Sequence, residues 1–147
     1  MVSKKYLPFF FIFTFLILFA CAKDESTEKG NSEAEKIAVE EANAWLALND
    51  NGQYAEGWDE ASELFKKALE KEAWEKQLTA VREPLGKLIS REVIKKEYLT
   101  SLPGAPDGEY VVIQYSTDFE NKKDAVETVT PMKDKDGHWR VSGYYIK

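Results

Sequence analysis

The side chains that could carry out acid–base or nucleophilic chemistry are few. The chain contains one histidine, His138, and one cysteine, Cys21, which excludes metal sites built on several such ligands. A Ser-His-Asp site would have to use His138, which follows Gly137 at an expected turn, where an exposed structural role is far commoner. The other candidates are polar residues on expected strands: Glu92, Tyr115, Asp118, Glu127, Arg140 and Tyr144.

A carboxylate on a strand acts as a general base where a dry pocket raises its pKa. Successive side chains point to opposite faces of a strand, so alternation makes most of these candidates ordinary solvent-facing residues. No glycine-rich motif for binding a phosphate or a dinucleotide is present. The sequence therefore predicts no catalytic residue, no metal ligand and no cofactor.

Aromatic residues at helical spacing offer a second kind of site, a cavity for a ligand. At this spacing aromatic side chains are more often core than pocket. Tyr54 and Trp58 are the expected exceptions, because the neighbouring Gly57 has no side chain to shield them. The residues predicted to line a ligand pocket are Tyr54, Trp58, Tyr115, Asp118 and Tyr144.

Cys21 is the residue with the clearest predicted chemistry. Two lysines, an apolar run over residues 6–19 and a group of small residues precede or surround it, which is the pattern of a secretory signal. The segment Leu18-Phe19-Ala20-Cys21 resembles the lipobox of bacterial lipoproteins. This resemblance implies a signal peptide over residues 1–20, cleavage before Cys21 and acylation of its sulfur. Two or three acyl chains would anchor the protein stably, since each buried CH₂ contributes about 0.8 kcal/mol.

A second cleavage site competes with the first. The segment Ala20-Cys21-Ala22 satisfies the small-x-small rule, and cleavage after Ala22 would release a freely secreted domain. Lipidation at Cys21 is preferred, because the single cysteine lies where the apolar run ends. Position 22 is not aspartate, which by resemblance to lipoproteins implies a protein facing the periplasm or cell surface, at the outer membrane if the cell has two membranes.

Composition indicates one small globular domain over residues 34–147. Hydrophobic residues make up 44% of the 147 residues, enough to form a core. Residues 21–33 contain Cys21 and then no bulky apolar side chain, which predicts a flexible tether. The net charge is −6 and lysines occur as isolated pairs, so a nucleic acid partner is excluded.

Hydrophobic periodicity predicts three helices followed by four strands. The first helix is expected to start at the N-cap Ser32 and end before residue 49, the second to cover residues 54–68, and the third to carry the apolar stripe Trp74, Leu78, Val81 and Leu85. Beyond Gly86 the period changes to two. Short turns between strands predict an antiparallel meander with helices on one face, an α+β fold. The expected strands cover residues 89–99, 109–117, 125–132 and 138–146.

This order of elements resembles the nuclear-transport-factor-2-like (cystatin-like) cone, in which a curved four-stranded sheet wraps a long helix and leaves a pocket at its open end. Several segments resemble the bacterial family known as domain of unknown function 4019, over residues 37–147. The resemblance implies the domain and no mechanism, since that family has no established activity. The segments are residues 44–48 (AWLAL), 54–65, 81–86 (VREPLG), 101–110 (SLPGAPDGEY), 127–131 (ETVTP) and 143–146 (GYYI).

The sequence thus favours an envelope-tethered lipoprotein of unknown biochemical activity, acting as a non-catalytic binding or interaction module through the cone pocket or the sheet face. Its expected partners are the membrane, through the anchor at Cys21, and a small apolar ligand or an envelope protein. The fold resemblance adds a homodimer formed through the sheet face. The alternative function is a small-molecule lyase or isomerase that uses the cone pocket.

Overall fold

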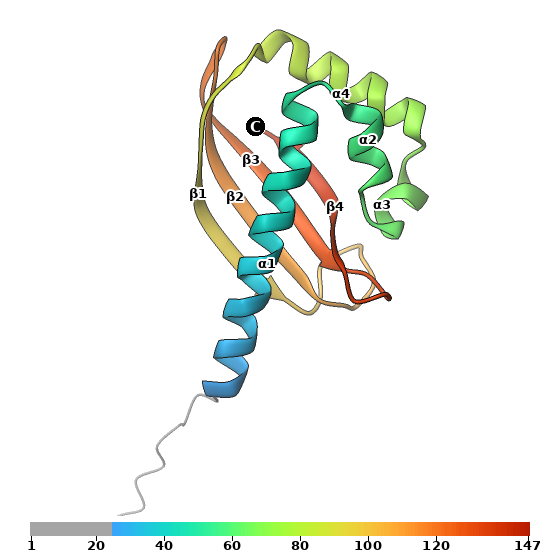
Figure 1. The fold of residues 1–147 in the computed structure, drawn as a ribbon, viewed down its shortest axis with the longest axis vertical. Helices are drawn as coiled ribbons and strands as arrows, with labels where there is room; N and C mark the ends of the chain where they lie inside the picture. The colour runs from blue at the N-terminus through green and yellow to red at the C-terminus, as the bar shows by residue number, and fades with distance from the viewer. Residues whose placement is uncertain (1–24) are drawn as a thin grey trace, which may run out of the picture.

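The computed structural model describes residues 25–147, which form four helices followed by four strands. The strands make one antiparallel sheet in the order β1-β2-β3-β4. Helix α1 crosses one face of this curved sheet, and the shorter helices lie beside α1 at one end of the sheet (Figure 1). The elements are α1 (Glu25–Asp50), α2 (Tyr54–Asp59), α3 (Glu63–Ala68), α4 (Lys71–Leu85), β1 (Leu88–Leu99), β2 (Tyr110–Phe119), β3 (Lys122–Lys133) and β4 (Trp139–Ile146).

The predicted α+β class and the antiparallel meander are confirmed. The number of helices is corrected, because the single helix expected over residues 54–68 is two short helices, α2 and α3. Ser62 lies at the break and caps α3, where its hydroxyl accepts a hydrogen bond from the backbone N–H of Phe65. The backbone N–H of Ser62 donates to the carbonyl of Val141 at 2.9 Å. The helix is interrupted where the chain hydrogen-bonds to the outer edge of β4.

Helix α1 begins at Glu25, so the predicted N-cap at Ser32 is wrong and most of the predicted tether over residues 21–33 is helical. Ala34 is the earliest residue along α1 that packs against the core, and the start of the helix extends beyond the sheet (Figure 1). A helix propagates at little cost once packing has nucleated it, which explains its extension through polar residues. The predicted signal peptide over residues 1–20 and the lipidation site Cys21 lie outside the described residues.

The four strands lie where the change of period placed them, with shifted ends. The turn between β2 and β3 contains two residues, Glu120 and Asn121, so β3 starts earlier than predicted. Asp124, which was expected in this turn, lies inside β3 with a φ of 53°. Its N–H donates to the carboxylate of Asp118 at 2.9 Å, beside the register shift between Thr117 and Phe119. The extra residue of this bulge explains why the turn was misplaced.

Aromatic side chains form the centre of the core, between α1 and the other helices. The ring of Trp45 lies 5.6 Å from that of Trp74 and 5.3 Å from that of Tyr144. The indole N–H of Trp45 donates to the carbonyl of Gly57 at 2.7 Å, and that of Trp74 donates to Tyr54. The expectation that the helical aromatic stripe is core is therefore confirmed for the buried residues Trp45, Phe65 and Trp74.

Gly57 allows two helices to pack closely. It is buried against α1, and a Cβ atom at this position would lie 2.7 Å from Oδ1 of Asn49. Such a distance is shorter than van der Waals contact, so only glycine allows α2 to approach α1 this closely. Asn49 is itself buried, and its side-chain amide donates to the carbonyl of Trp45.

Candidate functional site

Five ionisable side chains from five different elements meet inside the domain, and we call them the charge cluster: Asp50, Arg82, Arg91, Glu127 and Tyr144. Asp50 is the last residue of α1, and Arg82 is in the last turn of α4. The other three come from β1, β3 and β4. Two carboxylates and two guanidinium groups make the charge cluster electrically neutral.

Glu127 lies at the centre of the charge cluster and is fully buried. Its carboxylate accepts hydrogen bonds from Arg91 Nε at 2.6 Å, from the hydroxyl of Thr117 at 2.7 Å and from the hydroxyl of Tyr144. Arg82 lies 3.6 Å away as a further cation. A buried carboxylate is tolerated only with such partners, and here every carboxylate oxygen has one.

Asp50 closes the charge cluster on the side of the helices. Its Oδ2 accepts from Arg91 Nη1 at 2.7 Å, and its Oδ1 accepts from Arg91 Nη2 at 2.9 Å and from Arg82. Arg82 also lies over the ring of Phe119, with 4.8 Å between the guanidinium carbon and the ring centre. Arg91 therefore joins α1 to the sheet, because it binds Asp50 and Glu127 at once.

Contacts within the charge cluster lower the pKa of Asp50 and raise the pKa values of Arg91 and Tyr144. Burial alone would raise the pKa of Asp50, but hydrogen bonds and charge from Arg91 and Arg82 outweigh it and lower that pKa. Burial also disfavours a charged Arg91, yet Asp50 and Glu127 more than compensate and raise its pKa. Burial and the negative charge of Glu127 raise the pKa of Tyr144, which keeps its proton.

This arrangement leaves no free acid or base for chemistry at the charge cluster. Glu127, one of the strand carboxylates that the sequence offered as candidate general bases, is inaccessible and already accepts from three side chains. A hollow of about 340 Å³ reaches Asp50 and Arg82 from outside and is also bordered by Tyr54, Lys87 and Glu120, among others. Asp50 and Arg82 are already paired with each other, so neither is free to act on a reactant in this hollow.

The five residues predicted to line a ligand pocket are spread over the molecule. Tyr115 is buried, its hydroxyl donates to Asn43 at 2.9 Å, and burial raises its pKa to about 12. Tyr144 belongs to the charge cluster. Trp58 donates its indole N–H to Leu69, and Tyr54 borders the hollow at Asp50.

Asp118, the last of the five, lies on the side of the sheet opposite to the charge cluster. It pairs with Ser90 across β1 and β2, and its carboxylate accepts from Lys123 and from the backbone of Asp124. The other strand candidates are also accounted for. Glu92 is exposed, and Arg140 binds Asp134 and Asp136 at 3.1 and 2.8 Å.

Sequence reasoning did not find Asp50, Arg82 or Arg91. The buried stripe of α4 runs through Trp74, Leu78 and Arg82, whereas Val81, which was predicted to be on this stripe, is 47% exposed. Trp74, Leu78 and Arg82 are each four residues apart, a spacing that indicates that Arg82 faces inward with the other two. This signal was missed because Val81 is apolar and was predicted to face inward.

Arg91 faces inward because of a bulge. Leu88 pairs with Phe119, and Arg91 pairs with Thr117, with a register shift between Leu88 and Ser90. Leu88 and Arg91, which are three positions apart, therefore both lie on the inner face of the sheet, the face toward the helices. In a regular strand, residues three apart would lie on opposite faces.

The opposite face of the sheet, which we call the outer face, differs in composition. Gln114 of β2 pairs with Thr128 of β3, which pairs with Tyr145 of β4, so the three share one cross-strand row. These side chains are partly or largely exposed, and Tyr145 is 62% exposed. All four helices lie toward the other face (Figure 1). The uncharged residues of the outer face include Val112, Gln114, Ser116, Val126, Thr128, Thr130, Gly143 and Tyr145.

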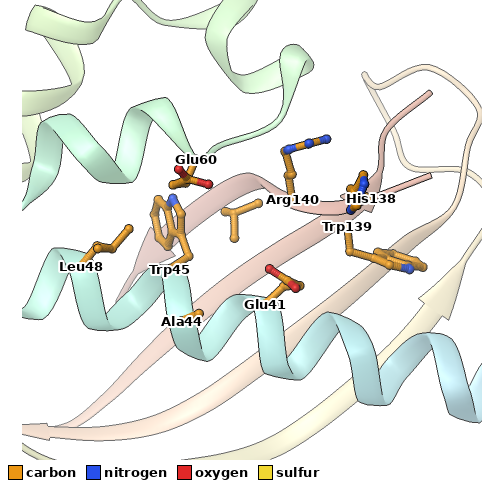
Figure 2. A pocket seen from close by; sticks show the side chains of 9 residues that line it. Glu41, Ala44, Trp45, Leu48, Glu60, His138, Trp139 and Arg140 are labelled. Atoms are coloured by element: carbon orange, nitrogen blue, oxygen red, sulfur yellow. The ribbon is translucent and has the colours of Figure 1, made fainter. Parts of the chain in front are cut away.

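A second cavity, of about 320 Å³, lies between α1 and the start of β4 (Figure 2). None of the five predicted pocket residues borders it. Its lining residues are Glu41, Ala44, Trp45, Leu48, Glu60, His138, Trp139, Arg140 and Val141.

These features define a small α+β domain with an internally neutralised charge cluster and an outer face that is uncharged at its centre. Residues 41–144 match the model of the family described as "Protein of unknown function (DUF4019)", and the chain belongs to this family. The resemblance found in the sequence is thereby confirmed, while the likeness to the nuclear-transport-factor-2-like cone stays a prediction. No curated protein and no solved structure matched the chain.

Residues 25–147 contain neither a candidate membrane-spanning helix nor a group of metal ligands. None of the helices in this range is long and apolar enough to span a membrane. Nor do three or more His, Cys, Asp or Glu side chains come together there in a group able to hold a metal ion.

Proposed function

We propose that the protein is an envelope lipoprotein, anchored through Cys21, whose domain is a non-catalytic interaction module that binds another envelope protein with its outer face. The observation that carries this proposal is the distribution of charge over the sheet. Charged residues of the sheet interior are paired with one another, and the central outer face is uncharged and uncovered by helices.

The outer face has the composition of a docking surface. Depletion of charged residues and enrichment in tyrosine distinguish the centre of a protein–protein interface from ordinary surface. Tyr145 and the row through Thr128 and Gln114 fit this description, with charged residues of β1, such as Lys95 and Glu97, at one border. This border resembles the polar rim of an interface.

The charge cluster supports a scaffold more than an enzyme. It links α1 and α4 to β1 and β3 through buried ion pairs and to β4 through the hydrogen bonds of Tyr144, which hold the sheet in one shape beneath the outer face. A preformed surface loses little conformational freedom on binding. A catalytic pocket would instead need a free group, and the hydrogen bonds within the charge cluster occupy its carboxylates.

The anchor follows from the segment that ends at Cys21, and α1 adds a geometric consequence. Helix α1 starts four positions after Cys21, and its first residues extend beyond the sheet (Figure 1). Residues 25–33 at 1.5 Å per residue form a helical spacer of roughly 14 Å. A spacer of this kind would hold the domain away from the lipid surface with less freedom than a flexible tether.

A site-specific photocrosslinking experiment in the native host tests both parts of the proposal. A photoreactive amino acid replaces Thr128 on the outer face or, as the control, Gln77 on the exposed side of α4. We expect a discrete adduct with a different protein at position 128 alone. We also expect the parent protein in the membrane fraction and the Cys21→Ser variant released from it. An adduct of twice the protein's mass would mean that the partner is a second copy of this chain and not another envelope protein. No adduct at position 128, or equal adducts at both positions, contradicts the proposal.

A further inference from the structure

The cavity between α1 and β4 is separate from the outer face and from the charge cluster. Trp45, Leu48 and Val141 give it an apolar floor, and polar side chains surround its mouth (Figure 2). Ligand cavities have volumes of about 300–1,000 Å³ and combine an apolar lining with a few polar groups. At about 320 Å³ this cavity is large enough for a compact molecule of few heavy atoms.

Two carboxylates stand on opposite sides of the cavity. Glu41 projects from α1 toward β4, and Glu60, at the end of α2, lies across from it beside Trp45 (Figure 2). Within residues 25–147 neither carboxylate forms an ion pair. Both are therefore available to a ligand.

Arg140, the arginine that borders this cavity, does not neutralise them. Its guanidinium donates to Asp136 at 2.8 and 2.9 Å and to Asp134 at 3.1 Å. Two carboxylates already share its single charge. Glu41 and Glu60 therefore give the lining of this cavity two negative charges that Arg140 does not balance, so a cation is favoured there.

We propose that this cavity binds a small organic cation, an ammonium or guanidinium group on a short apolar stem. Glu41 and Glu60 would accept hydrogen bonds from the charged group, and the stem would lie on Trp45 and Leu48. Such charge-assisted hydrogen bonds are stronger than neutral ones, and the apolar floor excludes water from the stem. A metal ion is not favoured, because it would leave the apolar floor unused.

The test is a titration of the full lipidated chain, in neutral detergent, with butylammonium, followed by the NMR signals of the four indole N–H groups. Butanol, which has the same stem and no charge, is the control ligand. We expect butylammonium to shift the signals of Trp45 and Trp139, which border the cavity, and to leave those of Trp58 and Trp74 in place.

Variants identify the carboxylates. The double variant Glu41→Gln/Glu60→Gln should bind butylammonium about tenfold more weakly. Its matched control, Glu40→Gln/Glu56→Gln, makes the same change of charge at exposed positions on α1 and α2 and should bind as the parent does. All four positions are exposed, so both variants should fold, which a thermal melt checks.

The blocked amino acid Nα-acetyl-lysine methylamide distinguishes the source of the cation. If it binds at the same signals and with the same dependence on Glu41 and Glu60, the cavity accepts a lysine side chain of a protein. If butylammonium alone binds, the ligand is a free amine. The proposal is overturned if neither shifts the two signals, if butanol binds as well as butylammonium, or if the control variant weakens binding as much.

Discussion

The inner and outer faces of the sheet place their polar residues in opposite ways. On the inner face Arg91 and Glu127 are charged and almost or fully buried, whereas the middle of the outer face carries uncharged, accessible residues such as Thr128. Charge on a strand is usually taken as a sign of solvent exposure. Here buried charge is tolerated because each ion has a partner of opposite sign and further hydrogen bonds.

The two faces should therefore differ in how strongly a substitution affects stability. The inner face depends on the complete set of partners, since removal of one leaves another charge buried and alone. Side chains of the outer face make few contacts within the chain and are available for binding. Changes of the same chemical kind should therefore have large effects on the stability of one face and small effects on the other.

The largest effect is expected for Glu127→Gln. Loss of its charge leaves Arg91 and Arg82 with one carboxylate between them, and breaking a buried pair in this way costs about 3–5 kcal/mol. Urea unfolding measures the free energy of unfolding. Glu92→Gln, an exposed glutamate on β1, is the matched control and should change it by less than about 0.5 kcal/mol. Equal effects of the two changes would mean that the charge cluster is not a unit of stability.

A second pair of changes adds one methyl group to each side of the sheet. Gly57→Ala, in the layer over the inner face, would bring its Cβ within 2.7 Å of Asn49 and should destabilise the domain by about 2 kcal/mol. Gly143→Ala, on the outer face, meets Thr130 at an ordinary 3.7 Å and should be close to neutral. Thermal unfolding compares them. Adding Asn49→Ala should recover part of the loss from Gly57→Ala, because the two sites are in contact.

Adjacent tyrosines give a test at the level of one hydroxyl. Tyr144→Phe removes a group that donates to Glu127 and accepts from Arg82 at 3.2 Å, so a loss of about 1.5 kcal/mol is expected. Tyr145→Phe removes an exposed hydroxyl on the outer face and should have no measurable effect. Chemical denaturation of both variants under one set of conditions decides the point, and a neutral Tyr144→Phe would contradict the role of its hydroxyl.

Acid should weaken the inner face through Asp50. The folded protein holds the pKa of Asp50 below its ordinary value of 3.8, so its contribution to stability is complete above that value. The contribution is lost as the pH falls through the lower, folded pKa. Unfolding free energies measured from neutral to acidic pH should therefore decline at the acidic end, and the decline should be shallower in Asp50→Asn. An identical pH profile in the variant would assign acid sensitivity to other carboxylates.

The smallest effect on stability is expected for Thr128→Lys. Its side chain is accessible and pairs with Gln114 and Tyr145 without a buried hydrogen bond of its own, so the free energy of unfolding should change by less than about 0.5 kcal/mol. A charge in the middle of the outer face should nevertheless abolish crosslinking from a probe at a neighbouring position, such as Val126. A stable variant that retains the adduct would remove the outer face from the proposed function.

The sequence alone was sufficient for the order of the elements, helices first and then four strands, but not for the break between α2 and α3 or for the start of β3. Period-two patterning predicted four strands and placed the change from helix to strand after Gly86, which follows α4 and has a φ of 73°. These are local properties of neighbouring residues. The motifs also identified the family, which the match over residues 41–144 confirms.

Only the tertiary structure decided which polar residues are inside. A bulge in β1 turns Arg91 inward, α4 buries Arg82 in place of Val81, and Ser62 breaks a helix to bind the edge of β4. Each depends on partners far apart in the chain, as between Asp50 and Arg91 or between Arg91 and Glu127. A charge can be buried only where an opposite charge arrives in the right geometry, and the folded chain, not the local sequence, supplies that arrangement.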